Sequence, residues 1–240
     1  MRRAFLAGLA GLAAAAAVLI GAAAADNVSF DADETDLILS HGPWPVETPP
    51  DPSNRLSGKP DAIAFGKVLF DSPALSVDRG RSCATCHDAD RAFTDGHPRG
   101  AGIAVVDRNT PALHNMRLNR WYGWDGKSDN LWAQSIAPIL DARELGMTPA
   151  TLRARIEKTP ELAAGYSSLF GAPPSAHDAE AAMVNIAKAL AAYQETILSG
   201  KSAFDRFRDA LAASDADGIA AYPDGAKRGL KLFVGRGRCD

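Results

Sequence analysis

The stretch that decides the fold is Cys83-Ala84-Thr85-Cys86-His87. The spacing C-x-x-C-H is the attachment signature of c-type haem, in which two thiols form thioethers to the porphyrin and the adjacent imidazole binds the iron. Cysteines three positions apart lie about one helical turn apart, so both sulfurs can reach one edge of a flat macrocycle. A thioredoxin-like redox pair would need a βαβ context, and a zinc site would need four ligands. The motif therefore predicts haem c, bound through Cys83 and Cys86 with His87 on the iron.

The composition favours helices over sheet. The chain has 240 residues, of which 46% are hydrophobic but only 7% aromatic. Much of the apolar content is alanine, the strongest helix former, and no stretch has a convincing strand pattern. We therefore predict an all-α fold, in a chain long enough for one good-sized domain or two small ones.

The N-terminus has the pattern of an export leader. Arg2-Arg3 supply a positive region, residues 4–21 are apolar, and Ala23-Ala24-Ala25 offer a cleavage site before Asp26. An uncleaved membrane anchor is the alternative, because the apolar run is nearly long enough to span a bilayer. We expect residues 1–25 to be a signal peptide and the protein to reside in the periplasm.

The charge of the chain restricts its partners. Loss of the two leader arginines takes the formal net charge from −3 to −5. A net negative charge argues against nucleic acid as a partner and permits a cationic one.

Prolines and caps divide the rest of the chain. Residues 26–59 contain five prolines and few periodic apolar residues, so we predict an extended N-terminal arm. A long loop should follow the cysteine motif as far as Asp107, and Trp121 and Trp132 are expected in the core. Helices are predicted from Pro60 to about Asp71, at 131–140 with Pro138 ending or kinking it, after the caps Thr148 and Thr159, from about Asp178 to Leu198, and after Ser202.

A short internal repeat bears on the interpretation of the end of the chain. Gly66-Lys67-Val68-Leu69-Phe70 precedes the cysteine motif, and Gly229-Leu230-Lys231-Leu232-Phe233 precedes Cys239 in a similar way. A chance match is the alternative. We interpret Cys239 as the first cysteine of a second C-x-x-C-H motif, and the chain as the N-terminal portion of a longer protein.

An ordered set of motifs from about residue 53 to 240 resembles the bacterial di-haem cytochrome c peroxidase family, which includes the MauG-like oxidases. The motifs are Phe65-Gly66-Lys67-Val68-Leu69-Phe70, Ser82-Cys83-Ala84-Thr85-Cys86-His87, Phe93-Thr94-Asp95-Gly96, Arg108-Asn109-Thr110-Pro111, Trp124-Asp125-Gly126 and Leu131-Trp132-Ala133-Gln134. The resemblance implies two cytochrome c-like domains: a peroxide-reactive haem domain at 60–200, and the start of an electron-transfer haem domain at 201–240.

The resemblance also implies roles for the residues of the first domain. His87 matches the proximal haem ligand, and Gln134, Pro138 and Glu144 match the distal pocket. Cleavage of a bound peroxide needs a group that takes a proton and returns it, and a carboxyl with a pKa raised by burial can do both, so Glu144 is the candidate. The alternatives are a surface Glu144 paired to Arg143 or a lysine, and a Gln134 on a helix surface.

The resemblance suggests roles for three further residues. Trp124 matches an electron relay between the two haems, although a tryptophan is also a common core residue. Asn109 matches a ligand of an interdomain calcium ion, although asparagine before Thr-Pro is also a common turn capper. His97 is the loop candidate for a sixth ligand of the first haem iron.

Three functions are compatible with this pattern. The first is a peroxidase that reduces hydrogen peroxide with electrons from a small soluble cytochrome c or a cupredoxin. The second is a MauG-like oxidase that modifies a partner protein, and the third is a plain electron carrier, which would need neither Gln134 nor Glu144. We favour the peroxidase, and we leave open whether it forms a homodimer.

Overall fold

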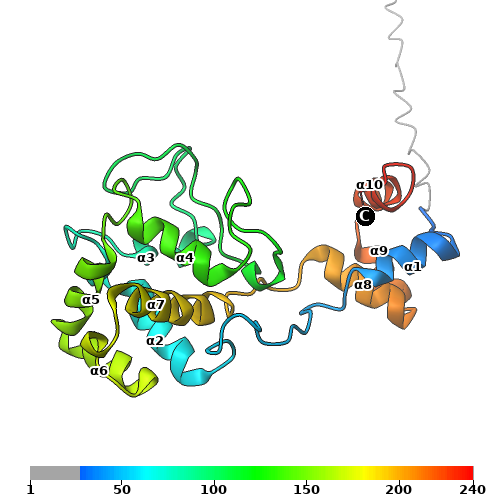
Figure 1. The fold of residues 1–240 in the computed structure, drawn as a ribbon. Coiled ribbons are helices and arrows are strands. Elements are labelled where there is room, and N and C mark those ends of the chain that lie inside the picture. Colours follow the sequence, from blue (N-terminus) through cyan, green and yellow to red (C-terminus); the bar gives the residue numbers. More distant parts are fainter. Residues whose placement is uncertain (1–27, 240) are drawn as a thin grey trace, which may run out of the picture. The chain divides into compact units, whose positions relative to one another are not determined.

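The computed structural model describes residues 28–239, and regular structure within them is helical, with isolated β-bridges in place of strands. The predicted signal peptide and its cleavage site before Asp26 lie outside the described residues. Residues 42–202 form one compact unit, and the flanking segments up to His41 and from Ala203 form another (Figure 1). Within the described part of the chain, no helix has the length and apolar character needed to cross a membrane. The all-α prediction is therefore confirmed.

The larger unit is built on two long helices in close contact, α2 (Pro60–Asp71) and α7 (Ala179–Gln194). The helices α4 (Leu131–Leu140) and α5 (Pro149–Glu157) also pack on α7, while α6 (Pro160–Phe170) packs on α2 and α5. Leu69, Leu152 and Ile186 are fully buried between them. Gly66 allows the close approach of α2 to α7, because a Cβ there would lie 2.0 Å from the carbonyl oxygen of Ala189.

Several helix boundaries follow the predicted signals. Helix α2 begins at Pro60, and the Thr148 hydroxyl accepts a hydrogen bond from the Thr151 amide at the start of α5. Gly171 ends α6 in the left-handed conformation at φ +74°. The prediction that the longest helix runs to Leu198 was wrong, because α7 ends at Gln194. Beyond it, the carbonyl of Ile197 accepts a hydrogen bond from the amide of Asn115, a contact between residues far apart in the sequence.

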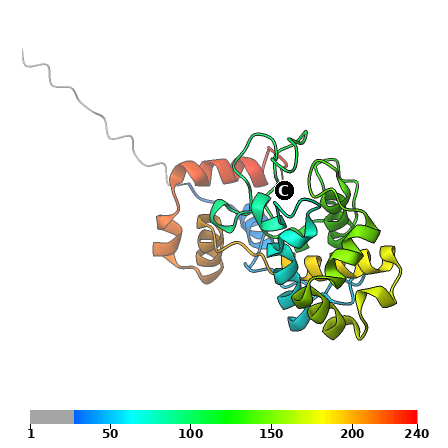
Figure 2. The ribbon, with the colours of Figure 1, turned by 90° about the vertical axis from the view of Figure 1, so that its left-hand side faces the viewer.

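The segment after α3 (Cys83–Cys86) is mostly irregular, as predicted. It contains two short 3₁₀ turns, η2 (Ala89–Arg91) and η3 (Met116–Leu118). In Figures 1 and 2 these loops, coloured cyan-green to green, gather on one side of the helices. Trp121 is 57% exposed, with the Arg120 guanidinium 5.7 Å from its ring centroid, so its predicted place in the core was wrong.

The smaller unit corrects the prediction of an extended arm over residues 26–59. Within that stretch lies the helix α1 (Ala32–Ser40), which Asp31 and Glu34 start with a capping box. Ile38 of α1 is buried with Phe207 in the core of this unit, so burial of an apolar face outweighs the proline-rich context. The other helices of the unit are α8 (Ala203–Ala213), α9 (Ala216–Ala221) and α10 (Asp224–Val234).

Candidate functional site

The cysteine motif forms the one-turn helix α3, which packs against α2. The Ser82 amide donates to the Thr85 hydroxyl at 3.0 Å, and the His87 amide donates to the Cys83 carbonyl at 2.9 Å. These bonds fix the single turn that separates Cys83 from Cys86. The two thiols therefore have the spacing that attachment to one macrocycle requires.

His87 is held by the loop that follows α3. Its Nδ1 lies 2.9 Å from the carbonyl oxygen of Phe93, and its ring centroid lies 6.3 Å from that of Phe70. Burial lowers the pKa of His87, and hydrogen bonds to the carbonyls of Phe93 and Pro111 oppose this effect. A neutral imidazole that donates its Nδ1 proton to a carbonyl carries its lone pair on Nε2. His87 is thus prepared to bind a metal through Nε2.

The two thiols lack the character of a redox pair. Burial raises the pKa of Cys83 to about 12, and burial together with the carboxylates of Asp95 and Glu144 raises that of Cys86. Redox-active cysteines need a lowered pKa, because the thiolate is the reactive form. No group of three His, Cys, Asp or Glu side chains suited to a metal ion occurs within residues 28–239, so the cysteines have no zinc-ligand set around them.

Helix α4 carries Gln134, whose side-chain oxygen Oε1 is buried and has no hydrogen-bond partner. A Cβ built on Gly123 would lie 3.1 Å from this oxygen, so the amide faces the loop that also carries Trp124. Pro138, one turn further along α4, lacks the amide that would bond to the Gln134 carbonyl, yet the helix continues to Leu140. A buried amide oxygen without a partner is costly, and a bound ligand would satisfy it.

Glu144 lies in the turn between α4 and α5 and is partly buried. Burial raises its pKa, as does Asp141, while Arg143 and Lys127 act in the opposite direction. The Glu144 charge also contributes to the raised pKa of both Cys83 and Cys86, so its carboxyl is near enough to the cysteine motif to interact electrostatically with both thiols. The alternative, a surface ion pair between Glu144 and Arg143, does not form.

Arg143 has other partners. Its guanidinium pairs with Asp107 at 2.9 Å and with Asp141 at 3.1 Å. The loop carboxylate Asp107 gave no signal in the sequence, because it lies 36 residues from Arg143.

These residues fit a c-type haem. The chain presents two thiols, an imidazole with a fixed tautomer, a buried amide oxygen without a partner, and a carboxyl whose pKa is raised. Cys83 and Phe93 also pack against the hydrophobic core of the unit, which supplies the apolar surroundings that a porphyrin needs.

Trp124 and Asn109 contact each other. Trp124 is 57% exposed, which excludes the alternative of a core residue, and its Nε1 donates to the carbonyl oxygen of Asn109 at 2.9 Å. No sequence pattern pairs these two residues.

His97 and Cys239 are the remaining candidates. His97 is exposed, and its amide donates to Asp95 Oδ1 at 3.0 Å. It lines a small polar hollow of about 240 Å³ with Asp88 and Arg91, and its described contacts include neither Gln134 nor Glu144. Cys239 is exposed at the end of the smaller unit.

Comparisons with known proteins agree with this site. The sequence matches the family described as di-haem cytochrome c peroxidase over residues 60–212. The methylamine utilization protein MauG of Methylorubrum extorquens is 33% identical over 219 residues, which cover 90% of this chain and 58% of the relative. Cytochrome c551 peroxidase of Pseudomonas aeruginosa is 30% identical over 195 residues, which cover 78% of this chain and 53% of the relative.

A solved structure shares the fold. The crystal structure of the diheme peroxidase BthA from Burkholderia thailandensis aligns with a TM-score of 0.62 at 28% identity, covering 80% of this chain and 48% of that chain. The chain spans about half the length of the curated relatives it matches. The predicted resemblance is confirmed, because the family match extends over more than half of the sequence. This protein belongs to the di-haem cytochrome c peroxidase family.

Proposed function

We propose that residues 42–202 form the domain at which a di-haem c-type peroxidase reduces hydrogen peroxide to water. The observation that carries the proposal is the environment of Glu144, a partly buried carboxyl with a raised pKa whose charge reaches both thiols of the haem motif. A plain electron carrier has no use for such a group. Electrons would come from a small soluble cytochrome c or a cupredoxin in the periplasm.

Three residues would hold the cofactor. Cys83 and Cys86 would form the thioethers, and His87 Nε2 would bind the iron while Phe93 fixes the ring through Nδ1. A haem bound in this way supplies the iron that binds peroxide and takes up its oxidising equivalents. The chain's contribution is to hold the imidazole neutral and in one orientation.

Glu144 would move the proton that the reaction requires. Its carboxylate takes the proton from the inner oxygen of hydrogen peroxide and returns it to the outer oxygen, which leaves as water. A raised pKa brings the carboxyl closer to the pH at which it can both accept and donate. The unpartnered Gln134 Oε1 would accept a hydrogen bond from the peroxide and so orient it, with Pro138 shaping the same helix face. With two electrons and two protons per peroxide, two waters form.

The remaining candidates would serve the electron supply. Trp124 would relay electrons from a second haem, and its bond to Asn109 fixes the indole for this role. Cys239 would begin the attachment site of that haem, and Asn109 would also bind calcium. His97 would act as a sixth iron ligand only if its loop left the present contacts with Asp95.

A MauG-like oxidase is the second candidate. The observation in its favour is the share of this chain that aligns with each relative. The MauG protein of Methylorubrum extorquens covers 90% of this chain, against 78% for the cytochrome c551 peroxidase. In this function the same distal residues would act on peroxide, and the oxidising equivalents would oxidise a partner protein.

The test replaces Glu144 by glutamine, which keeps the size of the side chain and removes its ability to shuttle a proton. Stopped-flow absorbance should show a loss of roughly 10²–10⁴-fold in the rate of reaction with hydrogen peroxide, the usual contribution of a general acid-base group. Glu161→Gln, at an exposed glutamate of α6, is the control and should react at the wild-type rate. A Glu144→Gln rate within a factor of a few of wild type would overturn the proposal.

A further inference from the structure

The loop at residues 99–107 lies directly on the turn that carries Glu144. The Ala104 amide donates to the Arg143 carbonyl at 2.8 Å, and the Ile103 amide donates to the Glu144 carbonyl at 3.3 Å. Both contacts are between backbones, so they do not depend on the identity of the side chains. The loop therefore follows the backbone of the turn rather than passing over it at a distance.

Gly102 is the point of closest approach. A Cβ at this position would lie 2.3 Å from the Arg143 carbonyl oxygen and 2.8 Å from the Glu144 Cα. Both atoms belong to the backbone, which cannot move aside as a flexible side chain could. Only glycine allows the loop to lie this close to Glu144.

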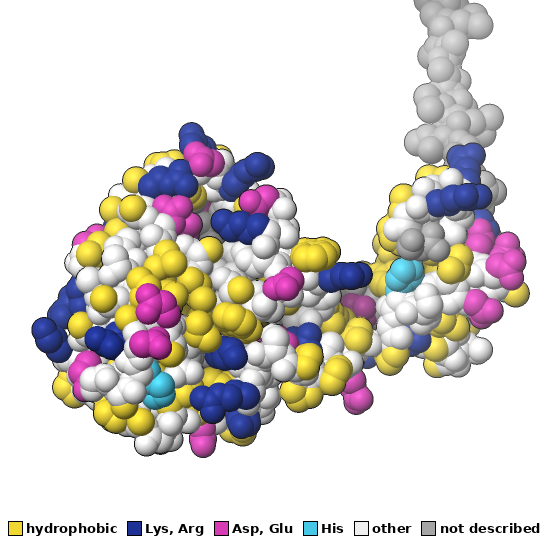
Figure 3. Space-filling model, viewed as in Figure 1, with side chains coloured by type: hydrophobic (Ala, Val, Ile, Leu, Met, Phe, Trp, Pro, Cys, Tyr) yellow, Lys and Arg dark blue, Asp and Glu magenta, His cyan; other side chains and the backbone are white. Residues whose placement is uncertain are grey.

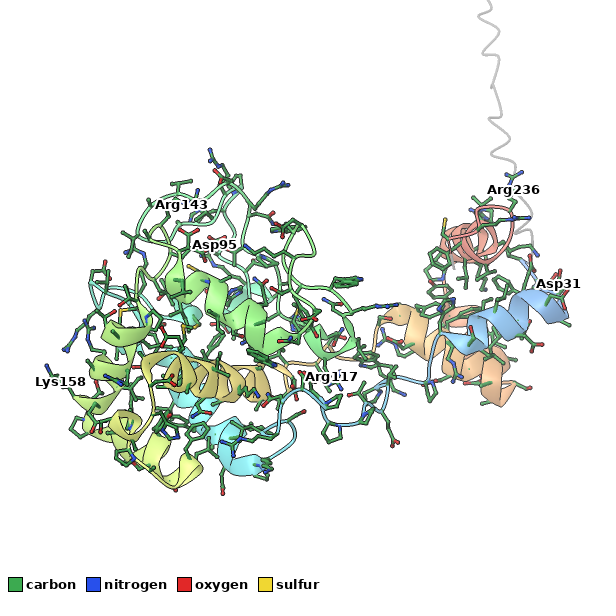
Figure 4. The ribbon with its side chains drawn as sticks, viewed as in Figure 1. Asp31, Asp95, Arg117, Arg143, Lys158 and Arg236 are labelled. Atoms are coloured by element: carbon green, nitrogen blue, oxygen red, sulfur yellow. The ribbon has the colours of Figure 1, made fainter. Side chains whose placement is uncertain are left out.

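Charged side chains fasten the two ends of the contact. Arg143 Nη1 lies 2.9 Å from Asp107 Oδ2, and Arg99 lies 3.4 Å from Asp107 Oδ1. At the other end, the amide of Ala101 donates to Asp95 Oδ2 at 3.2 Å. Figure 4 labels Arg143 and Asp95 at the same end of the larger unit, and Figure 3 shows basic and acidic side chains interleaved there.

We propose that residues 99–107 form a fixed cover over the Glu144 turn, in which Gly102 and Arg143 are positioning residues that hold the Glu144 carboxyl in place and shelter it from bulk water. The proposal rests on the proposed function of Glu144 as the acid-base group. It assigns roles to two residues that have no part in binding the haem. Arg143 acts through Asp107 on the loop, and Gly102 acts through the backbone of the turn.

The electrostatics of Glu144 give the cover a measurable consequence. The charged and titratable groups that face Glu144 are Asp141 and Arg143 in its own turn, Lys127 in the preceding loop, and the thiols of α3. Burial is the largest cause of the raised pKa. Displacing the cover admits water to the carboxyl, so the pKa of Glu144 should fall toward its ordinary value.

The experiment compares Gly102→Ala with Gly200→Ala in the haem-loaded protein. No heavy atom lies within 4 Å of a Cβ at Gly200, which makes it the matched control. Hydrogen exchange, read by mass spectrometry on the peptide that contains Ile103 and Ala104, should be roughly tenfold faster in Gly102→Ala, because the free energy equivalent to tenfold lies within the typical cost of overpacking. The acid limb of the peroxide rate should also move to lower pH.

Two outcomes separate the cover from the proposed function. If Glu144→Gln abolishes the acid limb while Gly102→Ala changes neither the limb nor the exchange, the cover is refuted and the acid-base role stands. If Glu144→Gln reacts at the wild-type rate, the proposed function fails, whereas the exchange result still decides whether the loop is fixed. Should Gly102→Ala not bind haem, Asp107→Asn removes only the two ion pairs of Asp107, with Arg143 and with Arg99, and should show smaller changes in the same direction. Unchanged exchange in Asp107→Asn would count against the cover.

Discussion

Replacing Gly66 by alanine should destabilise the larger unit, although alanine is the better helix former. The added Cβ would lie 2.0 Å from the Ala189 carbonyl oxygen and 2.9 Å from the Tyr193 Cβ, so α2 and α7 would have to separate. Overpacking of a tight contact typically costs about 1–3 kcal/mol. The higher helix propensity of alanine than of glycine offsets about 1 kcal/mol of this cost. Since the contact is with backbone, we expect the upper part of the range and a net loss of about 1–2 kcal/mol in the free energy of unfolding.

Urea unfolding of the haem-loaded protein, followed by circular dichroism, measures this loss. The midpoint should fall while the slope stays the same, because the surface exposed on unfolding is unchanged. Gly229→Ala is the control, since Gly229 is exposed in α10 and a Cβ there meets nothing within 4 Å. That substitution should leave the smaller unit as stable or more stable. A midpoint for Gly66→Ala equal to or above that of wild type would refute the packing of α2 on α7 described above.

Three further predictions concern the site. Replacing Cys83 and Cys86 by alanine should remove covalent haem from this domain, and an unchanged haem count in the pyridine haemochrome assay would contradict the attachment site. Trp124→Phe loses the bond to the Asn109 carbonyl and should slow steady-state turnover while peroxide still reacts in stopped flow; turnover at the wild-type rate would make Trp124 a structural residue. The raised pKa of Glu144 means that the folded protein binds its proton more tightly than the unfolded chain. The stability that this carboxyl contributes should therefore be full below about pH 4.3 and be lost as the pH rises through the folded-state pKa. Urea midpoints measured across this range should show the loss in wild type and not in Glu144→Gln, and parallel curves would count against the raised pKa.

The sequence predicted those helix boundaries that local signals determine. Pro60 and Thr148 act through local backbone geometry and capping, so their neighbours in the sequence are sufficient to identify them. Just after the end of α7 at Gln194, the Ile197 carbonyl accepts a hydrogen bond from Asn115, which is far away in the sequence. No local pattern could have indicated it.

Helix α1 was missed although a local signal was present. Asp31 and Glu34 have the spacing of a capping box, but the prolines that follow dominated the prediction. What stabilises α1 is the burial of Ile38 with Phe207, which comes from the other end of the chain. The sequence alone could not have paired these two residues.

The candidate site likewise combines residues that a local motif indicates with residues that only tertiary contacts bring together. The residues proposed to bind haem, Cys83, Cys86 and His87, lie within one short motif, so local sequence was enough to suggest them. Family spacing indicated Glu144, whereas its surroundings depend on Asp107 and Gly102, which come from a loop with no regular structure. Irregular loops are positioned by tertiary contacts, and these are not encoded in a periodic pattern.

The most direct test of the central claim is a crystal structure of the haem-loaded protein with fluoride bound to the iron. We predict His87 Nε2 on one side of the iron and the fluoride on the other, with the Glu144 carboxyl donating to the fluoride at roughly 2.6–3.2 Å, the reach expected of a catalytic acid or base, and with Gln134 lining the same face. A face opposite His87 that is lined by neither side chain, with the Glu144 carboxyl turned to solvent, would contradict the account.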